Sequence, residues 1–151
     1  MKDYALYIFD WEGTITKGTS FGLSDNIVDL LKRLQTKGKK IAVATGGRRS
    51  SFDMVLEVYE LKDFFIYTRT CDECPPKPEP QMIYDILEFN SVKMEEAVMI
   101  GDTVNDMLMA QRAGIDRIAV CQGFDSRQEL EMQSPNFVFS SIKELYENMV
   151  L

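Results

Sequence analysis

Short apolar segments alternate with amphipathic segments along the whole chain of 151 residues. The apolar segments are continuous, as buried strands are, whereas the amphipathic segments carry apolar residues at helical spacing. The expected strands are residues 5–9, 40–45, 64–68, 97–102 and 117–121, and the expected helices are 24–38, 51–61, 80–89, 105–114 and 140–150. Strands that are apolar throughout are typical of a parallel sheet covered by helices on both faces. The pattern therefore predicts an α/β fold in three layers with a central parallel sheet.

The ends of several expected helices carry residues that favour helix starts. Ser24 and Asp25 are candidate caps for the first helix, and Pro80 suits the opening of the third. Ser140 or Ser141 can cap the last helix. These positions set the expected boundaries between helices and loops.

The length and charge of the chain limit its organisation and partners. No internal repeat, low-complexity segment or linker divides the sequence, so residues 1–151 are expected to form a single domain. The formal net charge of -7 disfavours nucleic acid and anionic membranes as partners. No apolar run is long enough to cross a bilayer, and the first residues do not resemble a signal peptide. We therefore expect a cytoplasmic protein.

The chain contains no histidine, which narrows the chemistry open to it. Ser-His-Asp and Cys-His hydrolases and histidine general bases are excluded. The odd number of cysteines, Cys71, Cys74 and Cys121, favours free thiols. Zinc binding by Cys71 and Cys74 is disfavoured, because the third cysteine is expected on a distant strand. Catalysis would have to use carboxylates, hydroxyls, lysine, arginine or thiols.

Acidic residues follow two of the expected strands at the point where each strand ends. Asp10 and Glu12 come directly after the first strand. Asp102 ends the fourth, and Asp106 lies four residues further on, at the start of a helix. Ligands of parallel sheets bind outside the carboxyl ends of the strands, so these acids are expected around one crevice. A cluster of carboxylates indicates a hard divalent cation, and Mg²⁺ is the expected cofactor.

Groups suited to binding phosphate are expected at the same edge. Thr45 and Gly46 follow the second strand, and Lys77 stands among prolines just before a helix. A hydroxyl, backbone amides of glycine and an ammonium group are donors that a phosphoryl group requires. Together with a metal site they indicate phosphoryl transfer.

The segments "FDWEGT", "VATGG", "KPEP" and "IGDTVND" occur in this order along the chain. In their order and spacing they resemble the motifs of the haloacid dehalogenase-like (HAD) phosphohydrolase superfamily. The resemblance covers almost the whole chain and implies a Rossmann-like domain and a Mg²⁺-dependent phosphatase.

The resemblance also implies roles for individual residues. Asp10 would be the nucleophile that forms a phosphoaspartate. Mg²⁺ would be held by Asp10, the backbone carbonyl of Glu12 and Asp102, with Asp106 supporting it directly or from just outside the ligand sphere. Thr45 and Lys77 would bind the substrate phosphate, with the amides of the adjacent glycines, Gly46 among them.

Glu12 departs from the family pattern, which has aspartate as the acid that protonates the leaving oxygen and then activates water. Glutamate can perform the same proton transfers, but its extra methylene displaces the carboxylate, and a shift of about 1 Å can cost on the order of 100-fold in rate. The sequence therefore predicts a working phosphatase with Glu12 as general acid/base. A catalytically weak or inactive module that binds phosphate and metal stays open as the alternative.

The spacing of the motifs leaves little room for a cap domain. The interval from Thr14 to Thr45 and that from Thr45 to Lys77 are each filled by one helix and one strand, leaving at most a short flap at residues 16–23. A capless site would be open to water. It would suit a phosphorylated small molecule, an exposed phosphate on a larger substrate, or shielding by a homo-oligomer. Phosphosugars, phosphoglycolate-like acids, nucleotides and phosphoproteins all stay open as substrates.

Other interpretations of these residues are less specific. Each acid could be a solvated turn residue or a helix cap, Thr45 a cap, and Lys77 a surface charge. Arg48 and Arg49 could contact a remote phosphate of a substrate or simply be solvated. A two-component receiver module also has acids, threonine and lysine at a parallel sheet, but in another chain order, which disfavours it here.

Overall fold

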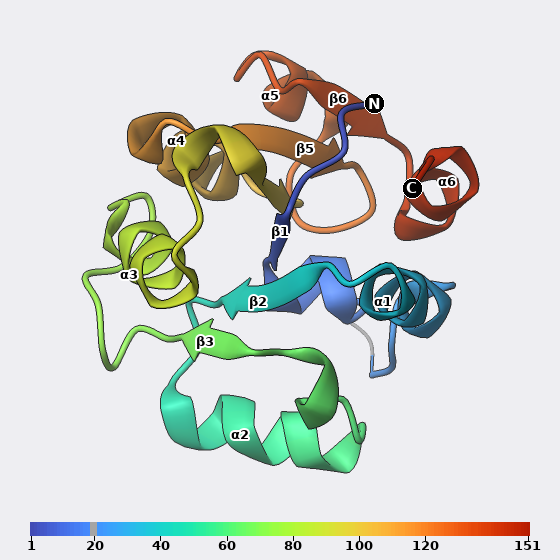
Figure 1. Ribbon diagram of the computed structural model, residues 1–151. Helices are drawn as coiled ribbons and strands as arrows, with labels where there is room; N and C mark the ends of the chain where they lie inside the picture. Colours follow the sequence, from blue (N-terminus) through green and yellow to red (C-terminus); the bar gives the residue numbers. More distant parts are fainter. Residues whose placement is uncertain (19–20) are drawn as a thin grey trace.

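In the computed structural model, which describes residues 1–18 and 21–151, six parallel strands form one sheet in the order β3-β2-β1-β4-β5-β6 (Figure 1). The central strand β1 pairs with both β2 and β4, so that Ile8 lies between Ala42 and Met99. The strands are β1 (Leu6–Phe9), β2 (Lys40–Ala44), β3 (Tyr67–Arg69), β4 (Ala97–Gly101), β5 (Asp116–Val120) and β6 (Phe137–Phe139). The α/β fold with a central parallel sheet, predicted from the apolar runs, is confirmed.

Helices cover both faces of the sheet, as Figure 1 shows for α1 and α6 on one side and α3 and α4 on the other. The helices are α1 (Ile27–Thr36), α2 (Arg49–Val58), α3 (Gln81–Asn90), α4 (Val104–Ala113), α5 (Arg127–Glu131) and α6 (Ile142–Asn148), with short turns η1 (Trp11–Ile15), η2 (Lys62–Phe64) and η3 (Met94–Glu96). In the described part of the chain, no helix is both long enough and apolar enough to cross a membrane.

The side chains of the strands alternate between two cores. Tyr7 and Phe9 pack on the face covered by α1, α2 and α6, and the buried cluster there includes Leu30. Leu6 and Ile8 pack on the opposite face against α3 and α4. Because β1 is buried on both faces, its carboxyl end is rigidly placed at the edge of the sheet.

The connections between strands hold no inserted domain in the residues that the structure describes. A single α-helix joins β1 to β2, and α2 with the short turn η2 joins β2 to β3. An antiparallel bridge between Thr16 and Leu23 closes the base of the expected flap, of which residues 19–20 lie outside the described residues. The capless arrangement predicted from the motif spacing is confirmed for these connections.

Several local predictions were wrong. Neither Ser24 nor Asp25 caps α1: the cap position is Asn26, with a left-handed backbone (φ 64°), and the Ser24 hydroxyl donates to the carbonyls of Thr14 and Thr16. The expected strand at 64–68 begins only at Tyr67, because Phe64 belongs to η2 and the next two residues connect η2 to β3. The prediction of a Ser141 cap is confirmed, since its hydroxyl accepts the amide of Glu144 at 3.1 Å.

Candidate active site

The first part of the site is the turn that follows β1. Asp10 is buried, and its amide donates to the Ile100 carbonyl on β4 at 3.0 Å. The chain then turns through Glu12 and Gly13, whose φ of 86° is in the left-handed region that favours glycine. A Cβ on Gly13 would also lie 2.7 Å from Cγ of Asp102. Glycine at this position therefore allows the β1 turn to approach the end of β4 closely.

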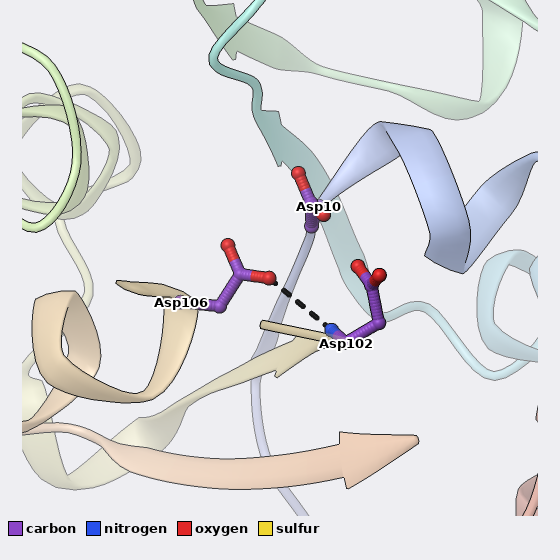
Figure 2. A group of neighbouring side chains, drawn as sticks. All are labelled: Asp10, Asp102 and Asp106. Carbon is purple, nitrogen blue, oxygen red and sulfur yellow. Dashed lines mark hydrogen bonds between the residues drawn. The ribbon is translucent and has the colours of Figure 1, made fainter. Parts of the chain in front are cut away.

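The carboxylates of Asp10, Asp102 and Asp106 lie together at the carboxyl edge of the sheet (Figure 2). One oxygen of each is within 4.8 Å of the others, and all three residues are buried. Asp102 follows β4, and its two oxygens accept the Thr14 hydroxyl at 3.0 Å and the Phe124 amide at 2.9 Å. The cluster thus joins the ends of β1 and β4 to the loop after β5.

Asp106 is held by the first turn of α4. One of its carboxylate oxygens accepts the amides of Asp102 and Thr103, both at 3.2 Å, and the Thr103 hydroxyl accepts the Asp106 amide at 3.1 Å. This is a reciprocal capping box, which orients the carboxylate toward the end of β4. Its other oxygen is free of the cap and faces Lys77.

Lys77 links two of the three carboxylates. Its ammonium nitrogen lies 2.6 Å from Oδ1 of Asp10 and 2.7 Å from Oδ1 of Asp106, and its side chain is only 10% exposed. Burial opposes the charge on this ammonium group, but the two carboxylates outweigh burial and raise the pKa of Lys77 well above its usual value. Lys77 is therefore a permanent cation.

The positive charge of Lys77 does not balance the negative charge of the three acids. Burial raises the pKa of Asp10 to about 6 against the opposing effect of Lys77, and burial together with the charge of Asp10 raises the pKa of Asp106 to about 6. Burial also raises the pKa of Asp102. Among the described residues of the cluster, three carboxylates face one ammonium, which leaves a charge deficit that a divalent cation would balance. Buried, clustered carboxylate oxygens fit a hard cation such as Mg²⁺.

The segment after β2 borders the acidic cluster. Thr45 is buried, its amide donates to the Arg69 carbonyl at 3.0 Å, and its hydroxyl accepts the Gly47 amide at 3.1 Å. Gly46 is exposed and lines the cavity above the acids. Thr45 itself lines a smaller adjoining hollow, which it shares with Glu12. Glu12 is exposed and borders both cavities.

An open cavity of about 430 Å³ lies over the acidic cluster. Its walls include residues of the loop after β5 that the sequence analysis did not select, Phe124 and Asp125, and Asn105 on α4. Gln122 in the same loop donates to the carbonyls of Gly13 and Thr14, both at 3.2 Å. Ligands of parallel sheets bind outside the carboxyl ends of the strands, and this strand-end rule selected Asp10. It would also have indicated this loop, because the loop follows β5 at the same edge.

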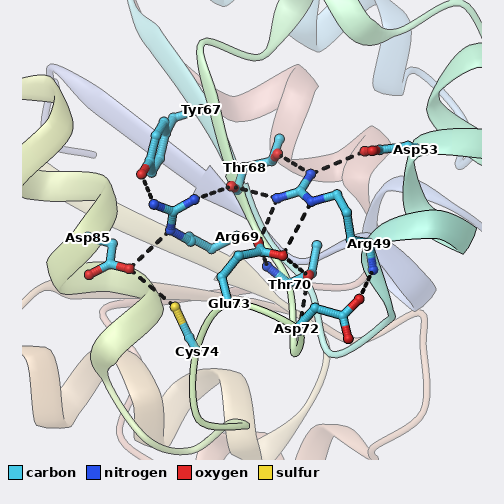
Figure 3. A network of polar contacts seen from close by, with 10 residues as sticks. All are labelled: Arg49, Asp53, Tyr67, Thr68, Arg69, Thr70, Asp72, Glu73, Cys74 and Asp85. Carbon is cyan, nitrogen blue, oxygen red and sulfur yellow. Dashed lines mark hydrogen bonds and ion pairs between the residues drawn. The ribbon is translucent and has the colours of Figure 1, made fainter.

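Arg49, the first residue of α2, takes part in a network of polar contacts with β3 and the segment that follows it (Figure 3). Its guanidinium pairs with Glu73 at 2.7 Å and with Asp53 at 3.1 Å, and it donates to the Thr68 hydroxyl at 2.8 Å. Arg48 pairs with Asp72 at 3.6 Å and is largely exposed. Arg49 is thus committed to contacts within the protein.

The cysteines are free. The buried Cys74 thiol donates to a carboxylate oxygen of Asp85 at 3.2 Å. Burial, together with this hydrogen bond, raises the pKa of Cys74 to about 11. The thiol therefore stays protonated at neutral pH.

A parallel sheet with buried acids and a lysine at its carboxyl edge places the protein among the Rossmann-like α/β proteins that bind ligands at strand ends. The chain belongs to the haloacid dehalogenase-like hydrolase family, whose model matches residues 2–120.

Curated relatives include proteins named pyrophosphatase PpaX. The one from Bacillus cereus is 30% identical over 122 residues, which are 80% of this chain and 56% of the relative. The one from Bacillus mycoides is also 30% identical over 122 residues, which are 57% of its length. The chain thus spans about half the length of these relatives.

Solved structures share the fold. A haloacid dehalogenase-like hydrolase from Bacteroides fragilis superposes with a TM-score of 0.86 at 16% identity, over 95% of this chain and 100% of the other. A protein described as a phosphatase from Clostridium difficile gives a TM-score of 0.86 at 18% identity, over 99% and 100% of the two chains. Chains of similar size therefore adopt this architecture.

Proposed function

We propose that the protein is a Mg²⁺-dependent phosphatase that hydrolyses a phosphomonoester through a phosphoaspartate on Asp10. The observation that carries this proposal is the ammonium of Lys77 held between Asp10 and Asp106, 2.6 and 2.7 Å away, beside the buried Asp102. A nucleophilic carboxylate, a fixed cation and a set of metal-binding acids are the groups that phosphoryl transfer requires.

Asp10, Asp102 and Asp106 would hold the metal, together with the backbone carbonyl of Glu12. A bound Mg²⁺ would offset the negative charge of the phosphate oxygens next to these acids. Lys77, the Thr45 hydroxyl and the Gly46 amide would bind the same phosphate oxygens. The burial of Asp10 and its ion pair with the 10% exposed side chain of Lys77 support this assignment, since they hold both groups in fixed geometry.

In the first step an oxygen of Asp10 attacks phosphorus, and the bond between phosphorus and the ester oxygen breaks. Glu12, protonated at the start, gives its proton to the departing oxygen, so that an alcohol leaves. In the second step Glu12 takes a proton from water, whose oxygen attacks the phosphorus of the phosphoaspartate. Inorganic phosphate leaves, and Asp10 and protonated Glu12 are restored.

Relatives named pyrophosphatase support hydrolysis of phosphate bonds as the class of reaction. The test is release of phosphate from para-nitrophenyl phosphate and a panel of metabolite phosphates, with and without Mg²⁺. Release that depends on Mg²⁺ and falls at least 100-fold in Asp10→Asn is expected, because the variant lacks the nucleophile. Phosphate release that is equal in the wild type and Asp10→Asn would contradict the proposal.

The alternative is a module that binds metal and phosphate with little or no turnover. The exposure of Glu12, in contrast to the buried Asp10, favours this alternative. Glu12→Asp separates the two functions. If the longer side chain of Glu12 limits proton transfer, Glu12→Asp increases kcat. If the wild type and this variant both bind phosphate with Mg²⁺ and neither releases phosphate from any ester, the module is the better description.

A further inference from the structure

The wall of the cavity above the acidic cluster carries more acidic than basic side chains. Besides Asp10, its walls carry the acidic side chains of Glu12 and Asp125, neither of which is paired with Lys77. Asp125 is fixed in place, because one of its oxygens accepts the Val104 amide at 2.7 Å. Asp125 thus adds a fixed negative charge to the cavity wall, where the part of a substrate beyond its phosphate would lie, whereas Glu12 carries the transferable proton in the proposed mechanism when the ester binds.

Positive charge on the same wall is scarce. Among the described residues that line the cavity, Lys77 is the one cation, and its ammonium is bound by Asp10 and Asp106. Arg48, paired with Asp72 at 3.6 Å, and Lys17, 4.0 Å from Asp25, do not line it. A second anionic group on a substrate, such as a carboxylate or another phosphate, would therefore meet the carboxylate of Asp125 without a partner cation.

An aromatic ring forms the apolar part of the wall. Phe124 is 55% exposed although its backbone is fixed, since its amide donates to Asp102 at 2.9 Å. The ring also lies close to Gly18, because a Cβ added to Gly18 would be 3.4 Å from two ring carbons. The backbone of Phe124 is thus fixed relative to Asp102, and its exposed side chain lines the cavity. A flat group can stack on such a ring, and a cation is attracted to its face.

We propose that the substrate is a phosphomonoester whose leaving group is a flat ring without negative charge, with a cationic substituent preferred over a neutral one. This inference rests on the proposed phosphatase function, because it assigns the leaving-group side of the same site. Pyrophosphate and phosphorylated carboxylic acids are correspondingly poor substrates.

Three aryl phosphates with similar phenolic leaving groups test the charge preference. They are tyramine O-phosphate, para-ethylphenyl phosphate and para-hydroxyphenylacetic acid O-phosphate, which carry a cationic, a neutral and an anionic substituent. With Mg²⁺, kcat/KM is expected to fall in this order, by about tenfold or more from the first to the last, because the carboxylate of Asp125 attracts a cationic substituent and repels an anionic one. Equal values, or preference for the anionic ester, would overturn the inference.

Two variants connect the preference to the residues named. Asp125→Asn keeps an oxygen for the Val104 amide but removes the charge, so the ratio between the cationic and anionic esters should shrink by about threefold. Phe124→Leu keeps apolar volume without the ring, and should lower kcat/KM for tyramine O-phosphate by about three- to tenfold relative to glycerol phosphate. Unchanged ratios in both variants would contradict these roles.

Binding to Asp10→Asn, loaded with Mg²⁺ and titrated with the same three esters by calorimetry, separates this inference from the proposed function. If the wild type hydrolyses no ester but the affinities fall from cationic to anionic, the phosphatase proposal fails and the charge preference stands. If the wild type hydrolyses the esters without this order, the inference fails alone. Absence of both turnover and ordered binding would overturn both.

Discussion

At the scale of single residues, the site depends on side chains that hold one another in place. Lys77 is the cation that keeps Asp10 and Asp106 together, and both carboxylates lie within 2.7 Å of its nitrogen. Such a buried arrangement contributes to stability only while every member is present, because each remaining charge would otherwise lack a partner. The same side chains can therefore be probed through stability as well as activity.

Lys77→Met should destabilise the protein by about 3 kcal/mol at pH 8, because it leaves buried carboxylates without their ammonium. The free energy of unfolding, from urea titration, measures the loss. The loss should be smaller at pH 5, where Asp10 and Asp106 are largely protonated in the native protein. The control is Lys143→Met, which removes an exposed ion pair in which Lys143 lies 3.7 Å from Glu147. It should change the free energy of unfolding by less than about 1 kcal/mol. Equal losses in both variants would show that Lys77 is not engaged as described.

Gly123→Ala should displace the carboxylate of Asp102, since a Cβ on Gly123 would lie 2.7 Å from Cβ of Asp102. Mg²⁺ affinity, measured by calorimetry, is expected to fall roughly 10-fold or more, as it does when neighbours of metal ligands are altered. Gly46→Ala is the matched control, because a Cβ there would meet no atom within 4 Å. Mg²⁺ affinities that fall equally in both variants would argue against the close approach.

At the scale of secondary-structure elements, the site combines loops from separate parts of the chain. The segment after β2 and the segment before Lys77 are joined by the ion pair between Arg49 and Glu73 (Figure 3). Glu73 also accepts the amide and hydroxyl of Thr70, at 2.9 and 2.7 Å. One carboxylate thus fixes the start of α2 against the end of β3.

A double-mutant cycle of Arg49→Met and Glu73→Gln should give a coupling energy of about 1 kcal/mol in urea unfolding, because both side chains are partly shielded from water. The exposed pair of Lys143 and Glu147 serves as the comparison and should give a few tenths of a kcal/mol. A coupling energy for Arg49 and Glu73 no larger than that of the exposed pair would mean that they do not join the two loops.

The sequence predicted elements well where their patterns are long, and poorly where they are short. The continuous runs of β1, β2, β4 and β5 and the periodic helices were found, because burial on both faces leaves a clear signal. β6 was missed, since it spans only Phe137–Phe139, as was α5, where Leu130 is the one buried residue. The left-handed cap at Asn26 also has no simple sequence signal.

The meeting of Asp10, Lys77, Asp102 and Asp106 could be predicted, because the strand-end rule and the chain order specify the edge at which they lie. Which carboxylate oxygens contact Lys77 could not be predicted, since that depends on side-chain positions. Gln122 and Phe124 follow β5 in a loop with no periodic pattern, and their contacts with the β1 turn and Asp102 arise only through the tertiary fold.

At the scale of the whole molecule, proton binding, metal binding and folding are linked through the acidic cluster. Asp10 and Asp106 have pKa values raised from 3.8 to about 6 in the folded protein. A group whose pKa is raised in the folded protein stabilises the fold fully at pH values below its pKa in the unfolded chain. This stabilisation is lost as the pH rises through its pKa in the folded protein. Without metal, the protein should therefore lose stability between about pH 4 and pH 6. The loss should be on the order of 1.4 kcal/mol per carboxyl group for each pH unit that separates its unfolded and native pKa values.

Mg²⁺ should reverse this trend, because a cation binds the deprotonated carboxylates and stabilises the folded state that presents them together. The rise in melting temperature caused by Mg²⁺ is expected to be small at pH 5 and to increase as pH passes 6, where Asp10 and Asp106 lose their protons. Thermal unfolding with Mg²⁺ or a chelator, at several pH values, measures it. Asp10→Asn should reduce both the change in stability of the metal-free protein with pH and the rise in melting temperature caused by Mg²⁺, because it removes one titrating ligand. If the Mg²⁺ effect is independent of pH from 5 to 8, ions bind elsewhere on the protein, and the carboxylates at the carboxyl edge of the sheet do not form the metal site.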